Sequence, residues 1–142
     1  MAEDEVNVRV RPIEMTDYQS VLHLAGSLIT LEEIAALNTQ DPSSLSFVAE
    51  AEGQIVGFNL AHILYVGIPL SKICVIQGIV VDHKYRRLGI GEMLIDAIEK
   101  QCRVRDISTV RALVEDGDER LQQFAVDTGF QLSVVDNYDK TI

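Results

Sequence analysis

Apolar and polar residues alternate near the start of the chain, and three longer apolar runs follow in its middle. Residues 6–13 alternate as the side chains of a half-buried strand do. The longer runs span residues 45–51, 55–65 and 73–81. The turn sequences Glu52-Gly53 and Gly67-Ile68-Pro69 separate these runs, and short turns join antiparallel neighbours. We therefore expect the runs to form an antiparallel meander of three strands.

Two short helices are predicted between the first strand and the meander. Thr16 or Asp17 can cap the first helix. Its apolar positions follow at helical spacing and are Val21, Leu22, Leu24 and Ala25. Thr30 and Glu33 have the spacing of a capping box, in which each side chain bonds the backbone of the other residue. A second, shorter helix should start there, and residues 38–44 should form a loop.

Two further helices and two strands are predicted in the second half of the chain. Apolar residues that give one helix a buried stripe are Ile90, Met93, Leu94, Ala97 and Ile98. Asp118 caps the other helix and Gly129 ends it. Residues 110–114 and 130–135 are the predicted strands. The order β-α-α-β-β-β-α-β-α-β predicts one α/β domain over residues 1–142, with a mixed, twisted central sheet flanked by helices.

Composition and charge limit the class of partner. The chain has 142 residues, of which 47% are hydrophobic and 24% charged, as in ordinary globular domains. Its formal net charge of −10 argues against binding a nucleic-acid backbone, which needs a basic surface. The negative charge is compatible with a cationic partner such as an amine, and solubility explains it equally well.

The expected location is the cytoplasm, with no membrane association. The first five residues, Met1-Ala2-Glu3-Asp4-Glu5, are acidic, whereas a signal peptide starts with basic residues. No apolar run approaches the roughly 18 residues of a membrane-spanning helix. Cys74 and Cys102 are too few and too far apart for a metal site or a disulfide framework. We expect both to be buried free thiols and expect no bound metal.

The strongest chemical signal is the glycine-containing segment at residues 79–91, which leads from an apolar run into a helix. Gly89 and Gly91 let the backbone approach a bulky anion, and the helix directs its positive end to the same place. A dinucleotide motif fails because Leu94 stands where a third glycine is needed, and no Gly-Lys-Ser/Thr of a P-loop follows. A phosphate cradle and a purely structural turn both remain open.

The sequence Arg86-Arg87-Leu88-Gly89-Ile90-Gly91 fits the pattern Q/R-x-x-G-x-G/A. In this it resembles the acetyl-CoA signature of the GNAT N-acetyltransferase superfamily. The order of strands and helices is similar from about Val6 onward, and the sequence Gly129-Phe130 resembles the end of that family's closing helix. The resemblance implies a GNAT-type fold and acetyl-CoA as the co-substrate.

The resemblance also implies which residues bind acetyl-CoA. Backbone amides that would hold its pyrophosphate belong to Arg87, Leu88, Gly89, Ile90, Gly91 and Glu92, while the side chains of Arg86 and Arg87 would add positive charge. Ile79 and Val81 match the strand positions that pair with the pantetheine arm. A backbone N–H near Ile79 or Val80 would stabilise the oxyanion. Gly78 is either a plain strand glycine or the mark of a bulge where this strand separates from its neighbour.

Two positions depart from the family's usual catalytic groups. Many relatives have a glutamate base where this chain has Gln77, and many have a tyrosine acid where it has Ala125. An amide cannot take up the proton. Replacement candidates are His62, Tyr65 and Glu50, with His83 and Tyr138 as weaker ones, and a structural role is open for each.

Two functions therefore remain. The first is an acetyl-CoA-dependent N-acetyltransferase that moves an acetyl group to a primary amine of a small molecule or peptide by direct attack. The second is a non-catalytic acyl-CoA-binding module in which Gln77 and Ala125 mark lost chemistry. Relatives commonly have one strand more than this chain provides. Either that strand is missing or a second subunit supplies the sheet edge, as it would in a homodimer.

Overall fold

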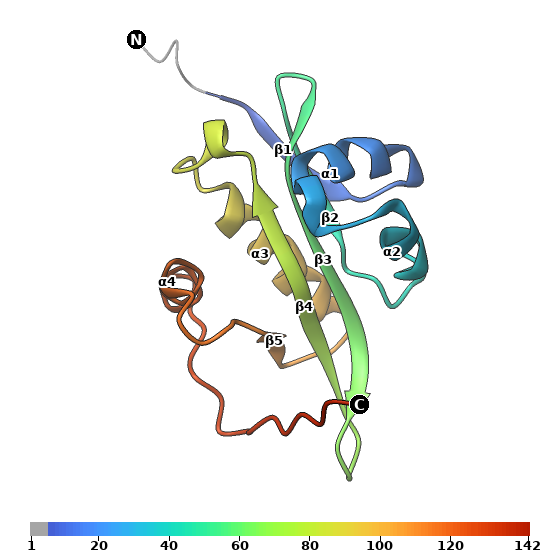
Figure 1. Cartoon of the computed structure of the whole chain (residues 1–142), viewed down its shortest axis with the longest axis vertical. Coiled ribbons are helices and arrows are strands. Elements are labelled where there is room, and N and C mark those ends of the chain that lie inside the picture. The colour runs from blue at the N-terminus through green and yellow to red at the C-terminus, as the bar shows by residue number, and fades with distance from the viewer. Residues whose placement is uncertain (1–5) are drawn as a thin grey trace.

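The computed structural model describes residues 6–142 and contains five strands and four α-helices (Figure 1). The acidic residues 1–5 lie outside the described part of the chain. The strands are β1 Val8–Pro12, β2 Phe47–Ala51, β3 Gln54–Val66, β4 Ser71–Val81 and β5 Val110–Ala112. The α-helices are α1 Tyr18–Ala25, α2 Leu31–Ala36, α3 Ile90–Val104 and α4 Glu119–Asp127. Short 3-10 helices are η1 Met15–Asp17, η2 Gly26–Leu28 and η3 His83–Tyr85.

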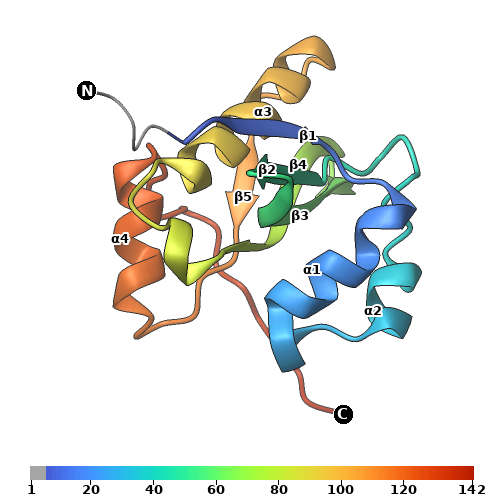
Figure 2. The same cartoon turned by 90° about the horizontal axis from the view of Figure 1, so that it is seen from above.

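The strands form one sheet in the order β1-β2-β3-β4-β5. Neighbours from β1 to β4 are antiparallel, which confirms the predicted meander, and β5 is parallel to β4. Helices α1 and α2 lie on one side of the sheet and α3 and α4 on the other (Figure 2). Each side has its own apolar core. The mixed α/β fold predicted from the sequence is confirmed.

Helix α3 packs closely on the sheet through an apolar stripe. Of the residues predicted for it, Ile90, Leu94 and Ile98 are buried and Met93 and Ala97 are half-buried, while Ile95 and Cys102 are buried in addition. The contact is close because Gly57 of β3 has no side chain: a Cβ there would lie 3.1 Å from Ile90 Cγ2 and 3.3 Å from the Val80 carbonyl oxygen. The start of α3 is thus held directly against the middle of the sheet.

The prediction of a last strand at residues 130–135 is wrong. This segment pairs with no strand, and the side chains of Leu132 and Val134 are fully exposed (101% and 100%). The alternation that suggested a strand is present, but β5 ends at Ala112 and offers only three residues for pairing. An extended segment without a partner strand leaves its backbone to bond with water.

The two N-terminal helices are capped in different ways. Thr30 Oγ1 accepts from the Glu33 N–H at 3.1 Å and a Glu33 carboxylate oxygen accepts from the Thr30 N–H at 2.9 Å, so the predicted capping box is confirmed. Asp17 is the N-cap residue of α1, but its side chain makes no cap bond to that helix. Its carboxylate instead accepts two hydrogen bonds from Arg11, each 2.7 Å, and one from the Glu14 N–H at 2.8 Å.

This ion pair predicts a stability change that depends on pH. The Arg11 guanidinium holds the pKa of Asp17 below its usual value. A lowered carboxyl pKa contributes stability above the unfolded-state value of about 3.9, and the contribution is lost as pH falls below it. Replacing Asp17→Asn should cost about 2 kcal/mol at pH 7, because Asp17 is buried and hydrogen-bonded to a cation. Urea denaturation at pH 7 and near pH 3.5 measures the difference, which should shrink in acid. The control Asp96→Asn, on the exposed face of α3, should change little at either pH.

Candidate functional site

The loop between η3 and α3 presents a row of backbone N–H groups. Arg87 and Gly89 have left-handed backbone conformations, with φ of 71° and 77°, and Gly89 is the N-cap of α3. Such turns direct successive N–H groups to one side. The first bond into the helix runs from Met93 N–H to the Gly89 carbonyl at 3.0 Å. Within residues 6–142, the N–H groups of residues 87–92 have no protein acceptor. They form a concave donor array at the positive end of a 15-residue helix.

The two glycines of the motif serve different physical needs. A Cβ at Gly89 would meet nothing within 4 Å, so glycine is suited there by its left-handed backbone. A Cβ at Gly91 would lie 2.8 Å from two ring atoms of Phe124 in α4. Gly91 therefore admits the Phe124 ring and joins α4 to the start of α3, which the sequence did not reveal.

The two arginines of the motif are placed differently. The Arg86 guanidinium turns back onto the protein, where Nε donates to the Val81 carbonyl at 3.4 Å and one terminal nitrogen lies 3.3 Å from His83 Nδ1. Arg86 thus ties the loop to the end of β4. Arg87 is exposed beside the donor array and makes no ion pair within residues 6–142.

Strands β4 and β5 separate next to the loop. Their pairing runs only from Cys74–Val110 to Ile76–Ala112. On the other side of β4, Leu60 pairs with Gly78 while Ala61 pairs with Ile76, so Gln77 is the extra residue of a bulge. The predicted separation at Gly78 is found, one residue after the bulged side chain.

The bulge sets which backbone groups of β4 are free. The Asp82 N–H donates to the Val56 carbonyl at 2.7 Å, and bonded pairs alternate along an antiparallel ladder. Gly78 and Val80 therefore bond to β3, whereas the N–H and C=O groups of Ile79 and Val81 point to the side that β5 has left. This edge is open over the two positions predicted to pair with pantetheine.

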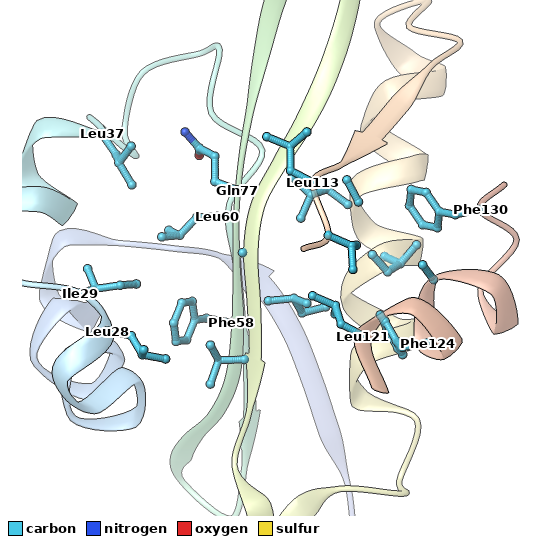
Figure 3. Close-up of a pocket in the computed structure, with 18 of the residues that line it drawn as sticks. Leu28, Ile29, Leu37, Phe58, Leu60, Gln77, Leu113, Leu121, Phe124 and Phe130 are labelled. Atoms are coloured by element: carbon cyan, nitrogen blue, oxygen red, sulfur yellow. The ribbon is translucent and has the colours of Figure 1, made fainter. Parts of the chain in front are cut away.

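A cavity of about 630 Å³ passes through this opening. Figure 3 shows its walls on the two sides of β4. The wall next to α1 and α2 contains Leu28, Ile29, Leu37, Phe58 and Leu60. The wall next to α3 and α4 contains Leu113, Leu121, Phe124 and Phe130. Residues Gln77 to Val80 lie between them, so one cavity connects both faces of the sheet at the bulge.

Of the predicted catalytic residues, His62 is the one that contacts a residue lining the cavity, Gln77. Its Nδ1 lies 2.6 Å from Gln77 Oε1 and its Nε2 lies 2.8 Å from the Leu37 carbonyl oxygen. With Oε1 in that place both ring nitrogens must donate, which requires the imidazolium. In the neutral imidazole Nε2 keeps its proton for Leu37, and the Gln77 amide turns over so that its NH₂ donates to Nδ1. The contact with His62 thus fixes the Gln77 amide at the cavity.

The other candidates lie outside the cavity walls. A Glu50 carboxylate oxygen accepts from Arg11 Nε at 2.5 Å, so this carboxylate belongs to the ion-pair cluster of β1 and β2. Tyr65 is 66% exposed on β3 and Tyr138 is 93% exposed in the C-terminal segment. His83 is exposed in η3. Ala125, at the family's tyrosine position, does line the cavity.

Several residues of the cavity were not found from the sequence. Leu28, Ile29 and Leu37 lie at the ends of short helices, where apolar residues are usual and no motif marks them. Glu33 is the one ionisable side chain among the lining residues. Its capping-box spacing predicts a structural role at the start of α2, and nothing in the sequence indicates that it lines the cavity.

Both cysteines are buried free thiols, as predicted, and burial raises the pKa of Cys74 to about 12. Within residues 6–142, no three His, Cys, Asp or Glu side chains come together in a way that could hold a metal ion. None of the helices in that range combines the length and hydropathy needed to cross a membrane.

The sequence matches the family described as Acetyltransferase (GNAT) family over residues 8–130. No curated protein matches the sequence. Among solved structures, the aminoglycoside 6'-N-acetyltransferase AAC(6')-Ih from Acinetobacter baumannii is 20% identical, with a TM-score of 0.81 over 96% of this chain and 99% of that one.

Two further solved structures are similar. The aminoglycoside N-acetyltransferase AAC(6')-Iy, crystallised with CoA, is 20% identical with a TM-score of 0.82 over 97% of each chain. A ribosomal-protein-alanine N-acetyltransferase from Brucella melitensis biovar Abortus 2308 is 19% identical with a TM-score of 0.78, over 95% of this chain and 99% of that one. At these identities the likeness establishes the fold.

The contact between Gly91 and Phe124 predicts a coupled effect on stability. Gly91→Ala should cost about 2 kcal/mol in the wild-type chain, because the methyl group forces the Phe124 ring to move. In a Phe124→Leu background the same change should cost nothing, since alanine is favoured over glycine in a helix. Gly89→Ala is the control and should cost about 1 kcal/mol in both backgrounds, through its backbone conformation alone. Urea denaturation of the variants measures these values, and an equal cost of Gly91→Ala in both backgrounds contradicts the packing explanation.

Proposed function

Since the chain belongs to the GNAT acetyltransferase family, and is an N-acetyltransferase by that membership, we propose that it transfers an acetyl group from acetyl-CoA to a primary amine by direct attack. The amine belongs to a small molecule or a peptide. The observation that carries the proposal is the cavity through the gap between β4 and β5. It extends from the side of α3 and α4, where the loop begins helix α3, to a compartment beside α1 and α2, so two substrates can meet at β4.

Acetyl-CoA enters from the side of α3 and α4 in this proposal. Its pyrophosphate binds the free N–H groups of residues 87–92, with Arg87 adding positive charge. The pantetheine arm pairs with the open edge at Ile79 and Val81 as an added strand would. AAC(6')-Iy, which has the same fold, was crystallised with CoA. Arg86 acts indirectly, by holding the loop against Val81.

The chemistry takes place at the bulge. The amine nitrogen attacks the thioester carbonyl carbon, a C–N bond forms, the C–S bond breaks, the CoA thiolate leaves, and the proton that the nitrogen releases passes through water to the thiolate. Of Ile79 and Val80, we assign the oxyanion to the Ile79 N–H, because the Val80 N–H is used by β3. The Gln77 amide, held in place by His62, bonds the attacking amine. Glu50 and Tyr65 have no catalytic role in this proposal.

The amine must lose a proton before it attacks. For a lysine-like amine with a pKa near 10.4 this costs about 4.6 kcal/mol at pH 7, and for an α-amine only about 1 kcal/mol. Gln77 cannot take the proton, so the proton passes to water or to Glu33, the one ionisable side chain of the lining. The structure therefore favours amines of low basicity.

We also propose that a second copy of the chain covers the C-terminal segment. The fully exposed Leu132 and Val134 alternate with polar residues in a segment that has no partner strand, which suits pairing between two copies. The reduced, buried thiols and the use of acetyl-CoA fit the cytoplasmic location expected from the sequence.

The assay for this function is the release of CoA thiol from acetyl-CoA in the presence of amines. Turnover well above hydrolysis with at least one amine is expected. The family assignment favours the enzyme over the non-catalytic module, and tight CoA binding without turnover for any amine supports the module instead.

CoA binding by the loop is tested with a charge reversal. Arg87→Glu should weaken CoA binding about tenfold, roughly 1.4 kcal/mol, and raised salt should reduce the difference. Arg103→Glu makes the same charge change in the last turn of α3 and should leave binding unchanged. Isothermal titration calorimetry with CoA measures both, and equal losses for the two variants contradict the proposed phosphate site.

A further inference from the structure

The acceptor compartment, defined as the cavity wall next to α1 and α2, is almost entirely apolar. Its side chains come from Leu28, Ile29, Ala36, Leu37, Phe58 and Leu60. Phe58 and Leu60 are buried in the sheet, while Leu28 is 77% exposed at the rim. The chain carries a net charge of −10, yet within residues 6–142 only Glu33 brings an acidic group to this cavity. The negative charge of the protein lies elsewhere on its surface.

The compartment has one polar group at its inner end. Within residues 6–142, Gln77 is the only uncharged polar side chain among the residues that line the cavity. The Leu37 carbonyl oxygen lies 2.8 Å from His62 Nε2, and His62 Nδ1 lies 2.6 Å from Gln77 Oε1, so the imidazole fixes the Gln77 amide at this end. A single amide at that place can bond one amine nitrogen. It is also next to Gly78 and Ile79, where the acetyl group is expected.

From these two observations, and resting on the proposed function, we propose that the acceptor is a primary amine carried on an apolar body with no second cationic group. The amine bonds the Gln77 amide and its aliphatic or aromatic body lies against Leu28, Phe58 and Leu60. Free aralkyl or alkyl amines and the N-terminus of a peptide that begins with an apolar residue share this chemistry.

Polycationic amines fit the compartment poorly. A second ammonium group on the acceptor would lose water against leucine and phenylalanine side chains without gaining a partner. Glu33 can pair with one such group at most, and one of its carboxylate oxygens already accepts from the Thr30 N–H at 2.9 Å. Several similar structures are aminoglycoside acetyltransferases, so the proposal separates this chain from them by substrate.

A matched pair of amines tests the proposal. Hexylamine and 1,6-diaminohexane have the same six-carbon chain and differ by one ammonium group. Thiol release should give hexylamine a kcat/KM at least about tenfold higher. Phenylethylamine should resemble hexylamine, and kanamycin and spermidine should resemble the diamine. Peptide amides beginning Phe-Gly-Gly and Gly-Gly-Gly are compared in the same assay. They show whether the apolar body belongs to a free amine or is the first side chain of a peptide.

A pair of variants links the preference to the compartment. Leu28→Asn removes apolar surface at the rim without adding charge, and it should reduce the ratio of kcat/KM for hexylamine over the diamine about tenfold. Leu70→Asn is the control: Leu70 is 68% exposed in the turn between β3 and β4, outside the cavity, and its substitution should leave the ratio unchanged. Both sites are exposed, so neither variant should impair folding.

The outcomes separate this inference from the proposed function. A kcat/KM for the diamine, spermidine or kanamycin that is higher than that for hexylamine contradicts the proposed acceptor class. The proposed N-acetyltransferase activity is not affected by that result. An equal change of the ratio in Leu28→Asn and Leu70→Asn overturns the role of the compartment. No turnover with any amine overturns the proposed function and the acceptor class together, and calorimetry with hexylamine on the CoA complex then shows whether the compartment binds apolar amines at all.

Discussion

The proposed function depends on the loss of pairing between β4 and β5 beside the bulged residue Gln77. A sheet is stable because neighbouring strands satisfy each other's backbone groups, so an interruption leaves donors and acceptors without partners. Here the unpaired groups are the N–H and C=O of Ile79 and the N–H of Val81, and Ile79 lines the cavity. The same bulge places Gln77 at the junction of the two compartments. One added residue in β4 thus creates the opening, the free edge and the polar group beside it.

Packing on the α3 side keeps this opening in place. Gly57 lets the start of α3 lie against the sheet, and Gly91 lets the Phe124 ring of α4 lie against α3. Phe124 also lines the cavity, so one aromatic ring connects the loop at the start of α3 with the wall of the opening. The Phe124 ring therefore keeps α4 packed against the core at a distance from β5. On the opposite side, α2 contributes the Leu37 carbonyl that fixes His62 and, through it, Gln77.

Much of this fold could be predicted from local patterns in the sequence. The alternation of the strands, the Thr30–Glu33 capping box and the turn at Glu52-Gly53 each depend on neighbouring residues, and all three were found as predicted. Long-range contacts decided the rest. The strand at 130–135 fails because no partner is present, Asp17 bonds Arg11 instead of capping α1, and Gly91 is explained by a ring from α4. The acceptor compartment was invisible because ordinary core residues form it.

The most direct test of the account is the protection of single backbone amides when CoA binds. Amide hydrogen exchange measured by NMR reports each N–H separately. On addition of CoA, exchange should slow at Ile79 and at residues 87–92, and it should not change at Val80, whose N–H is already bonded within the sheet. Unchanged exchange at Ile79 in the presence of bound CoA would contradict the claim that the opened edge of β4 receives the cofactor.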